Sequence, residues 1–239
     1  MQTSDTFFEQ GSFPMSFKFA TIAACAVGAL MMGSGVAHAT PSLDFSVQAW
    51  YSPTPNSNIN SANQQALPNN PVISASNEFF TGNFLGIPNW LDTNQNNNSL
   101  NGFTNNLAGF SNVQFYNGFN ANSPKLSSAP FSAVTLFDLT FTTNHSFSAL
   151  VTHDDGFSLW NAANTSYLYN YATPTNAVGD TINIGPGTYH LWYAEANGAP
   201  AQLTFSNVNV PEPGSLALLG TGLIGLGLIL RRRSRSRKA

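Results

Sequence analysis

The chain has 239 residues, of which only 8% are charged, and its formal net charge is −3. Six of the eight basic residues follow residue 230, so segment 40–210 holds one base, Lys125, against eight acids, a net charge of −7. A surface with a single lysine cannot neutralise a row of phosphates, which excludes nucleic-acid binding by that route. Adsorption to anionic lipid headgroups is excluded for the same reason.

The N-terminal part predicts export. Residues 1–14 show no organised signal, whereas Met15 is followed by Lys18, an apolar run over 19–36 and the small-residue site Ala37-His38-Ala39. This order is that of a secretory signal peptide cut by signal peptidase before Thr40. We therefore expect residues 1–39 to be the signal with an upstream extension, and Met15 to be the true start. The alternative is an unusually long region before the apolar run.

Cys25 is the only cysteine, and it lies inside the apolar run of the signal. Residues 22–25 superficially fit a lipoprotein box, but Lys18 is too close to leave an apolar segment before the cysteine. If Cys25 leaves with the signal, the mature protein has no thiol. Disulfides and thiol catalysis are then excluded.

Segment 40–210 is of a size for one domain. Residues 52–130 are rich in Asn, Ser, Pro and Gly, which form turns and loops. Apolar and aromatic islands recur through this stretch, beginning with the alternating strand pattern of 45–51. We predict a folded but loop-rich region, with 92–101 as the best candidate for a mobile loop.

The chain becomes regular from residue 133 onward. Alternating segments rich in β-branched and aromatic residues recur about every ten residues, separated by turn residues. This spacing predicts an all-β fold, an antiparallel β-sandwich or barrel, without amphipathic helices outside the two export segments. The expected strands are 134–141, 147–152, 157–160, 167–171, 181–184, 188–194 and 201–205.

Two blocks carry a resemblance to a known family. The first runs from Phe147 through Asp154-Asp155-Gly156 to Trp160, and the second is the glycine turn, strand and small-residue loop of 185–199. Together they resemble the protective-antigen-type β-sandwich of bacterial toxins, glycosidase appendages and yeast adhesins, over about residues 132–206. The resemblance implies a sandwich in which the aspartate pair, joined by a cis peptide, can hold Ca²⁺ that binds sugar hydroxyls.

By this resemblance, Asp154 and Asp155, with Glu195 or Asn197 from the later loop, are candidate Ca²⁺ ligands. Calcium takes six to eight hard oxygen ligands, so carboxylates must converge with amide or backbone oxygens. The alternative is that Asp-Asp-Gly is only a hairpin turn, because Asp and Gly tolerate positive φ. Trp160 and His153 are further candidates for contact with a ligand.

No catalytic pattern stands out. The histidines show no zinc spacing, and neither a nucleophile elbow nor a phosphate-cradling glycine loop is present in the sequence. The enzymatic alternative is a glycoside hydrolase using two carboxylates such as Asp138 and Glu195, which must then lie about 5–10 Å apart across a cleft. Among functions, we expect a non-catalytic structural or carbohydrate-binding module.

The last 29 residues predict sorting. Pro211-Glu212-Pro213 is followed by uncharged residues over 214–230, including four glycines, and then by the basic tail 231–238. As a helix, 17 residues span about 26 Å, at the low end for crossing a bilayer core, with the basic end in the cytoplasm. The arrangement resembles the PEP-CTERM sorting signal of Gram-negative bacteria, which implies cleavage by a membrane-embedded exosortase.

An ordinary anchor that stays in place is the alternative for this tail. The combined expectation is an exported protein that begins as an inner-membrane-anchored precursor and ends at the cell surface or outside the cell. Extracellular polysaccharide is the expected partner, besides the processing enzymes.

Overall fold

A computed structural model describes residues 42–53, 58–94, 98–209 and 220–227. In the described part of 42–209, β-strands are joined by loops and by two short helical segments, η1 (Ala62–Gln64) and α2 (Leu100–Phe103), and residues 220–227 are also helical. The strands are β1 (Leu43–Ser52), β2 (Glu78–Gly86), β3 (Asn89–Asp92), β4 (Phe110–Phe115), β5 (Val134–Thr143), β6 (Phe147–Asp154), β7 (Gly156–Asn161), β8 (Tyr167–Tyr171), β9 (Val178–Ile184), β10 (Gly187–Glu195) and β11 (Ala201–Asn209).

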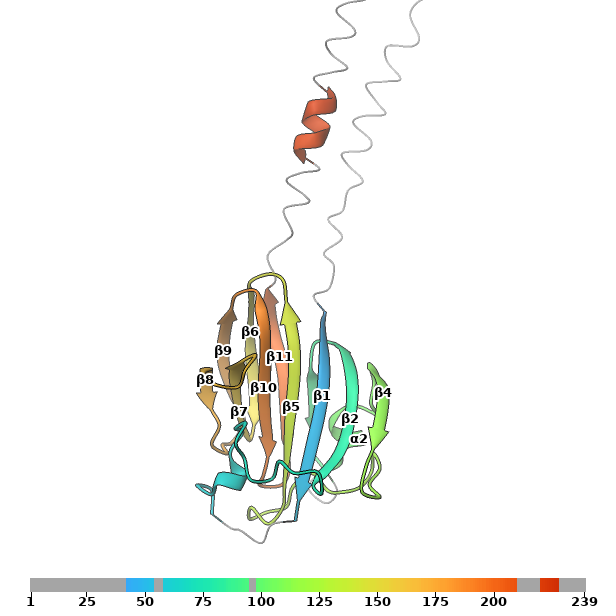
Figure 1. The fold of residues 1–239 in the computed structure, drawn as a ribbon, viewed down its shortest axis with the longest axis vertical. Coiled ribbons are helices and arrows are strands. Elements are labelled where there is room, and N and C mark those ends of the chain that lie inside the picture. The colour runs from blue at the N-terminus through green and yellow to red at the C-terminus, as the bar shows by residue number, and fades with distance from the viewer. Residues whose placement is uncertain (1–41, 54–57, 95–97, 210–219, 228–239) are drawn as a thin grey trace, which may run out of the picture. The chain divides into compact units, whose positions relative to one another are not determined.

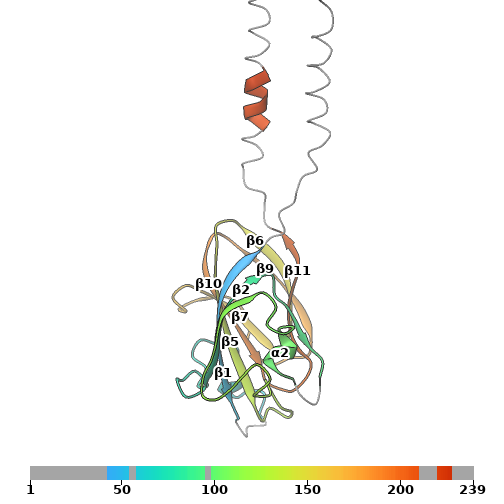
Figure 2. The same cartoon turned by 90° about the vertical axis from the view of Figure 1, so that its right-hand side faces the viewer.

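The described strands form two antiparallel sheets, one of seven strands and one of four. The larger has the order β4-β2-β1-β5-β10-β7-β8, and the smaller has the order β3-β11-β6-β9. Figure 1 looks onto the larger sheet, from β8 at one edge to β4 at the other, and Figure 2 shows the same strands from the side that carries α2. The expected all-β architecture with antiparallel sheets is confirmed.

The main core lies between the two sheets. Alternate side chains of β1, such as Phe45 and Val47, point into it, while Asp44 and Ser46 between them are exposed. The smaller sheet contributes Val151, Ile182 and Leu203, all fully buried. This alternation follows from the two-residue period of a strand, and burial of the large aliphatic and aromatic side chains is the main force that holds the sheets together.

A second apolar cluster covers the outer face of the larger sheet. Trp50 stacks on Trp192 there, with ring centroids 5.9 Å apart. The turn-rich segment 58–77 lies over this face, because the carbonyl of Ala66 accepts a hydrogen bond from Ser158 and its N–H donates to Ala172 at 2.9 Å. Segment 58–77 therefore covers the second apolar cluster on the outer face of the larger sheet.

The region predicted to be loop-rich contains more regular structure than expected. Residues 52–130 hold β2, β3 and β4, and β3 was missed because its four residues show no long alternation. The predicted mobile loop 92–101 is partly wrong. Asn98, Ser99 and Leu100 are buried, and the Asp92 carboxylate accepts the N–H of Ser99 at 3.1 Å.

The chain changes sheet between β6 and β7. Asp154 pairs with Gln202 in the smaller sheet, whereas Gly156 pairs with Ala194 in the larger one. None of Asp154, Asp155 and Gly156 has a positive φ. The predicted tight hairpin turn is therefore wrong, because the two strands do not pair with each other and the aspartates form a crossing between layers.

The export segments lie largely outside the described residues. This applies to the signal peptide of 1–39 and to the Pro211-Glu212-Pro213 motif with the basic tail. Residues 220–227 of the expected helix 214–230 are helical. Among the residues that the structure describes, no helix has the length and apolar character needed to cross a membrane.

Candidate functional site

The two aspartates at the sheet crossing are held close to the core. Asp155 is 3% exposed and Asp154 is 9% exposed, and the peptide bond between them is cis, as the resemblance implied. The Asp155 Oδ2 atom accepts the backbone N–H groups of Ala196 at 2.7 Å and Asn197 at 3.0 Å. The loop after β10 therefore fixes the Asp155 carboxylate.

The pair lines a small polar hollow of about 340 Å³. Oxygen-bearing side chains from two loops border it, namely Thr175 and Asn176 after β8 and Asn197 after β10. Thr175 and Ala177 also supply backbone N–H groups to Asp155 and Asp154 respectively. The remaining wall is formed by Ile59, Phe131, Pro174, Gly198, Ala199 and Pro200.

The carboxylates of the pair have no Lys or Arg partner in the described ranges. Lys125, the one Lys or Arg of those ranges, is exposed, and neither ion pair found there includes Asp154 or Asp155. Burial raises the pKa of Asp154 to about 6, and burial together with the nearby charge of Asp154 raises the pKa of Asp155 to about 7. The hollow thus holds desolvated negative charge that a bound cation would neutralise.

Glu195 does not join the pair in the hollow. Its side chain is fully buried, and its two carboxyl oxygens contact Tyr193 and Ser127. The Tyr193 hydroxyl accepts the N–H of Gln202 at 3.1 Å and donates its only proton to the carbonyl of Asp154, which can only accept. The 2.9 Å contact between that hydroxyl and Glu195 Oε2 therefore requires a proton on Glu195.

The other carboxyl oxygen of Glu195 accepts a hydrogen bond from Ser127. Ser127 Oγ accepts the N–H of Gly198 at 2.7 Å and the side-chain amide of Asn98 at 3.1 Å, so its own proton goes to Glu195 Oε1 at 2.5 Å. Burial raises the pKa of Glu195 well above its usual range, in agreement with this pattern. Glu195 is thus a neutral carboxylic acid that supports the crossing from behind, and its predicted role as a Ca²⁺ ligand does not fit its position.

His153 and Trp160, the two further candidates for contact with a ligand, lie in different surroundings. His153 is 1% exposed, with Nδ1 on the Asp155 carbonyl at 2.5 Å and Nε2 on Asp180 Oδ2 at 3.0 Å. Trp160 is partly exposed, donates to Ser158 Oγ at 2.8 Å and packs edge-on against Tyr167. Neither side chain lines the aspartate hollow.

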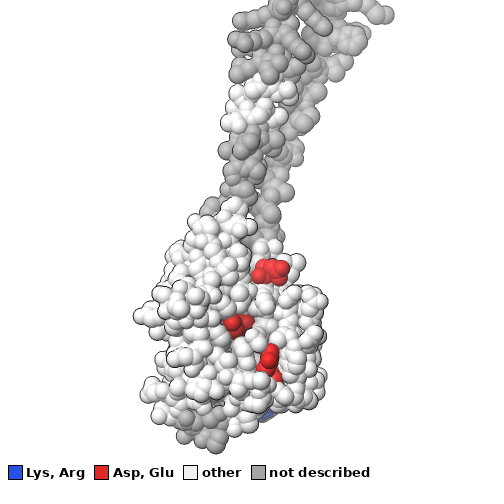
Figure 3. All heavy atoms as spheres, in the orientation of Figure 1, with Lys and Arg blue, Asp and Glu red and all other residues white. Residues whose placement is uncertain are grey.

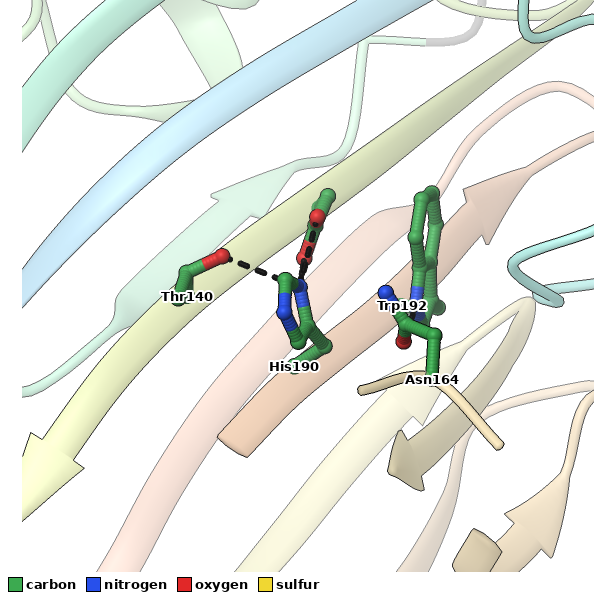
Figure 4. A network of polar contacts seen from close by, with 5 residues as sticks. Thr140, Asn164, His190 and Trp192 are labelled. Atoms are coloured by element: carbon green, nitrogen blue, oxygen red, sulfur yellow. Dashed lines mark hydrogen bonds and ion pairs between the residues drawn. The ribbon is translucent and has the colours of Figure 1, made fainter. Parts of the chain in front are cut away.

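Asp138 belongs to a separate polar network on the outer face of the larger sheet. Its carboxylate contacts His190 Nδ1 at 2.8 Å, and Thr140 lies 3.0 Å from the same nitrogen (Figure 4). The hydrogen bond to Asp138 raises the pKa of His190 above its usual value. Trp192, beside it, donates to Asn164 at 3.0 Å.

Asp138 and Glu195 face opposite sides of this sheet. In the pairing of β10 with β5, Asp138 lies opposite Trp192 and Glu195 lies opposite Thr135. Paired residues point to the same face of a sheet, and Asp138 and Thr135 are three residues apart on β5. Asp138 and Glu195 therefore point to opposite faces. The pair suggested for glycoside hydrolysis therefore does not meet across one cleft. Among the described residues, no three His, Cys, Asp or Glu side chains converge as a metal site, so a cation in the hollow needs neutral oxygen ligands beside the two aspartates.

Sequence reasoning missed part of this site. Thr175 and Asn176 follow Pro174 in a stretch whose composition predicts a loop but does not indicate where that loop lies. Ser127 and Tyr193 gave no signal as partners of Glu195, because they are far apart along the chain. Only Asp154, Asp155 and Asn197 of the expected ligands come together at the hollow.

Comparison with known proteins bears on the C-terminal part. Residues 209–233 match the family model described as the PEP-CTERM protein-sorting motif. The chain carries a PEP-CTERM sorting signal. A PEP-CTERM signal implies an exported protein that is sorted at its C-terminus, with exosortase as the general processing partner.

For the β-rich part, the crystal structure of the PA14 domain of the antifreeze protein MpAFP matches with a TM-score of 0.41 and 12% identity. The match covers 70% of this chain and 85% of that one. The PA14 domain is the protective-antigen-type sandwich that the sequence resembles, but a likeness of this degree transfers no ligand. No curated protein matches the chain.

Proposed function

We propose that this PEP-CTERM protein is a non-catalytic binding module that holds a calcium ion at Asp154 and Asp155 and uses it to bind hydroxyl groups of extracellular polysaccharide. The observation that carries the proposal is the pair of buried carboxylates facing a polar hollow, with no Lys or Arg side chain against them in the described ranges. Buried charge without a counter-charge is unfavourable, and a bound cation would remove that penalty.

The donor set favours calcium among the common cations. Every side-chain ligand available at the hollow is an oxygen, from the two carboxylates, the amides of Asn176 and Asn197, and the hydroxyl of Thr175. Calcium accepts six to eight such ligands in flexible geometry, whereas zinc prefers nitrogen and sulfur. When bound, the ion would supply open coordination positions for sugar hydroxyls, and the Asp155 carboxylate is already oriented by the N–H groups of Ala196 and Asn197.

The site is tested by calorimetric titration of the full chain in mild detergent with Ca²⁺. Wild type is expected to bind calcium, while Asp154→Asn and Asp155→Asn each weaken binding at least about tenfold, or about 1.4 kcal/mol. Asp44→Asn is the matched control, because Asp44 is an exposed acid on β1. The proposed site would be ruled out if wild type showed no heat of calcium binding. It would also be ruled out if Asp44→Asn lost as much calcium affinity as the two site variants.

Polysaccharide binding is tested separately by retention of the protein on the polysaccharide of its own cells. Retention in Ca²⁺ and release by a chelator are expected for wild type. The Asp155→Asn variant is expected to be washed off in both conditions. Retention that is unchanged by the chelator would remove the calcium-dependent part of the proposal.

A further inference from the structure

A groove lies beside the aspartate hollow, at the open side of the sandwich between two edge strands. Strand β8 is the edge of the larger sheet and β9 is the edge of the smaller one, and Figure 1 shows them next to each other. At one end Tyr169 joins them, because its hydroxyl bonds to the N–H of Asn183 at 2.8 Å and to its carbonyl at 3.1 Å. At the other end the strands are separated by a groove of about 470 Å³.

The groove combines the rings of Tyr171 and His153 with polar and aliphatic side chains. It is lined by Gln65, Asn170, Tyr171, Thr173, Val178 and Asp180, together with His153 at its base. It shares Thr175 with the aspartate hollow. His153 also links the two, because one ring nitrogen contacts Asp180 and the other contacts the Asp155 carbonyl. The groove and the hollow are thus adjacent.

Tyr171 presents a fixed aromatic face to this groove. One side of its ring packs on Phe157, with centroids 5.4 Å apart, and on His153 at 6.2 Å. The side chain is nevertheless 39% exposed. A ring supported from behind and open in front can stack on the apolar face of a small cyclic molecule without loss of side-chain freedom.

Asp180 supplies an oriented acceptor next to that ring. His153 Nε2 contacts Asp180 Oδ2 at 3.0 Å, and the same ring is fixed from its other side because Nδ1 contacts the Asp155 carbonyl. Partial burial and then the charge of Asp180 raise the pKa of the Tyr171 hydroxyl, so the hydroxyl and the Asp180 carboxylate are close to each other. The carboxylate is therefore held on the groove wall, where a ligand hydroxyl can donate to it.

We infer that this groove binds a neutral sugar unit, which stacks on Tyr171 and donates a hydroxyl to Asp180. The inference rests on the proposed function, since it names a second contact for the same saccharide beside the cation. Segment 40–210 carries a net charge of −7, and Asp180 is an acceptor, so like-charge repulsion disfavours uronic acids and sulfated sugars in this groove. The groove itself needs no metal.

Saturation-transfer NMR on the full chain in detergent tests the groove with methyl glucoside, methyl galactoside, methyl mannoside and glucuronate as probes. At least one neutral probe is expected to receive saturation, and glucuronate none. Tyr171→Ala is expected to lower affinity for that probe about tenfold or more, whereas Tyr171→Phe retains stacking and most of the affinity. Tyr167→Ala is the control, because Tyr167 is an exposed tyrosine of β8 outside the groove.

The outcomes separate this inference from the proposed function. A Tyr171-dependent signal that persists in chelator supports the groove whatever the calcium titration gives. Equal binding by Tyr171→Ala and wild type, or no saturation transfer to any neutral probe, would overturn the proposal that the groove binds sugar. The calcium site would then still be decided by its own titration. Thermal melts of each variant show whether a loss comes from unfolding, and in that case Asp180→Asn provides the second test.

Discussion

At the scale of single residues, the two aspartates contribute to how stability responds to pH. Their pKa values of about 6 and about 7 in the folded protein lie above the value of about 3.9 in an unfolded chain. Between these values the folded state binds more protons than the unfolded state, so stability falls as pH rises. The contribution is fully present below pH ~4 and is lost as pH rises through the two folded pKa values.

The metal-free protein is therefore expected to melt at a lower temperature at pH 8 than at pH 5, by roughly 2–4 °C for each kcal/mol lost. The Asp155→Asn variant is expected to flatten this dependence, because one of the two titrating groups is removed. Calorimetric melts in chelator across this range provide the measurement. Calcium, if it binds there, competes with protons and raises the melting temperature mainly above pH 6. A wild-type melting curve that rises between pH 5 and pH 8 would contradict the assignment.

Glu195 gives a second prediction at this scale. Glu195→Gln preserves both contacts, because an amide can donate to Tyr193 and accept from Ser127, as the neutral acid does. Its free energy of unfolding is expected to stay within about 1 kcal/mol of wild type. Glu195→Ala leaves two buried hydroxyls without their partner and opens a cavity, so a loss of about 2–4 kcal/mol is expected.

Denaturant unfolding of the two Glu195 variants measures these differences. Equal and large destabilisation by both substitutions would mean that Glu195 is ionised in the folded protein, contrary to the proton pattern. The infrared carbonyl band of a protonated carboxyl, present in wild type and missing in Glu195→Gln, is an independent check.

At the scale of elements, the crossing between β6 and β7 depends on a glycine. A Cβ atom at Gly156 would overlap the backbone carbonyl of Ala172, which cannot move aside as a flexible side chain would. Gly156 is therefore needed for close approach of two backbones rather than for a positive φ. The same carbonyl accepts the N–H of Ala66, so the crossing, β8 and the turn-rich segment meet at one point.

Gly156→Ala is expected to destabilise the fold by about 3 kcal/mol or more, at the upper end of overpacking effects, because backbone must shift. Gly185→Ala is the matched control, since a Cβ there has nothing within 4 Å. Chemical denaturation of both variants measures the difference. Equal stability of the two variants would show that Ala172 can move away at little cost in free energy.

At the scale of the whole molecule, charge is separated along the sequence. Six of eight basic residues follow residue 230, and Figure 3 shows a mostly uncharged surface with isolated acidic side chains. After removal of the signal peptide, residues 40–239 hold seven basic and nine acidic residues, a net charge of −2, so cleavage at the sorting signal would leave an exported part of net charge −7. The basic tail agrees with the expectation that this end of the precursor is cytoplasmic, and the acidic part is suited to neutral partners.

If the sorting signal is cleaved, protein recovered from the cell surface is expected to have lost residues 231–239. Intact-mass measurement is expected to show a product that ends near Pro211-Glu212-Pro213, and substitution of Glu212 by Ala is expected to leave the precursor uncut. Recovery of the mature protein with Arg231–Lys238 still attached would favour the permanent anchor.

The sequence was sufficient for features that depend on local pattern. Alternation predicted most strands after residue 133, because a two-residue period on a half-buried surface is a local property. The order of motif, uncharged stretch and basic tail likewise predicted the PEP-CTERM signal, which the family comparison confirmed. Asp154, Asp155 and Asn197 were found as candidate ligands through resemblance in two local blocks.

Only the tertiary structure decided how the strands are shared between sheets and which acids meet. Asp-Asp-Gly has the composition of a hairpin turn, but burial on both sides drives the chain from one sheet to the other at this point. Glu195 has the sequence position of a ligand, yet strand register turns it toward Tyr193 and Ser127 in the core. Such long-range register and burial depend on residues distant in the chain, which a local pattern does not encode.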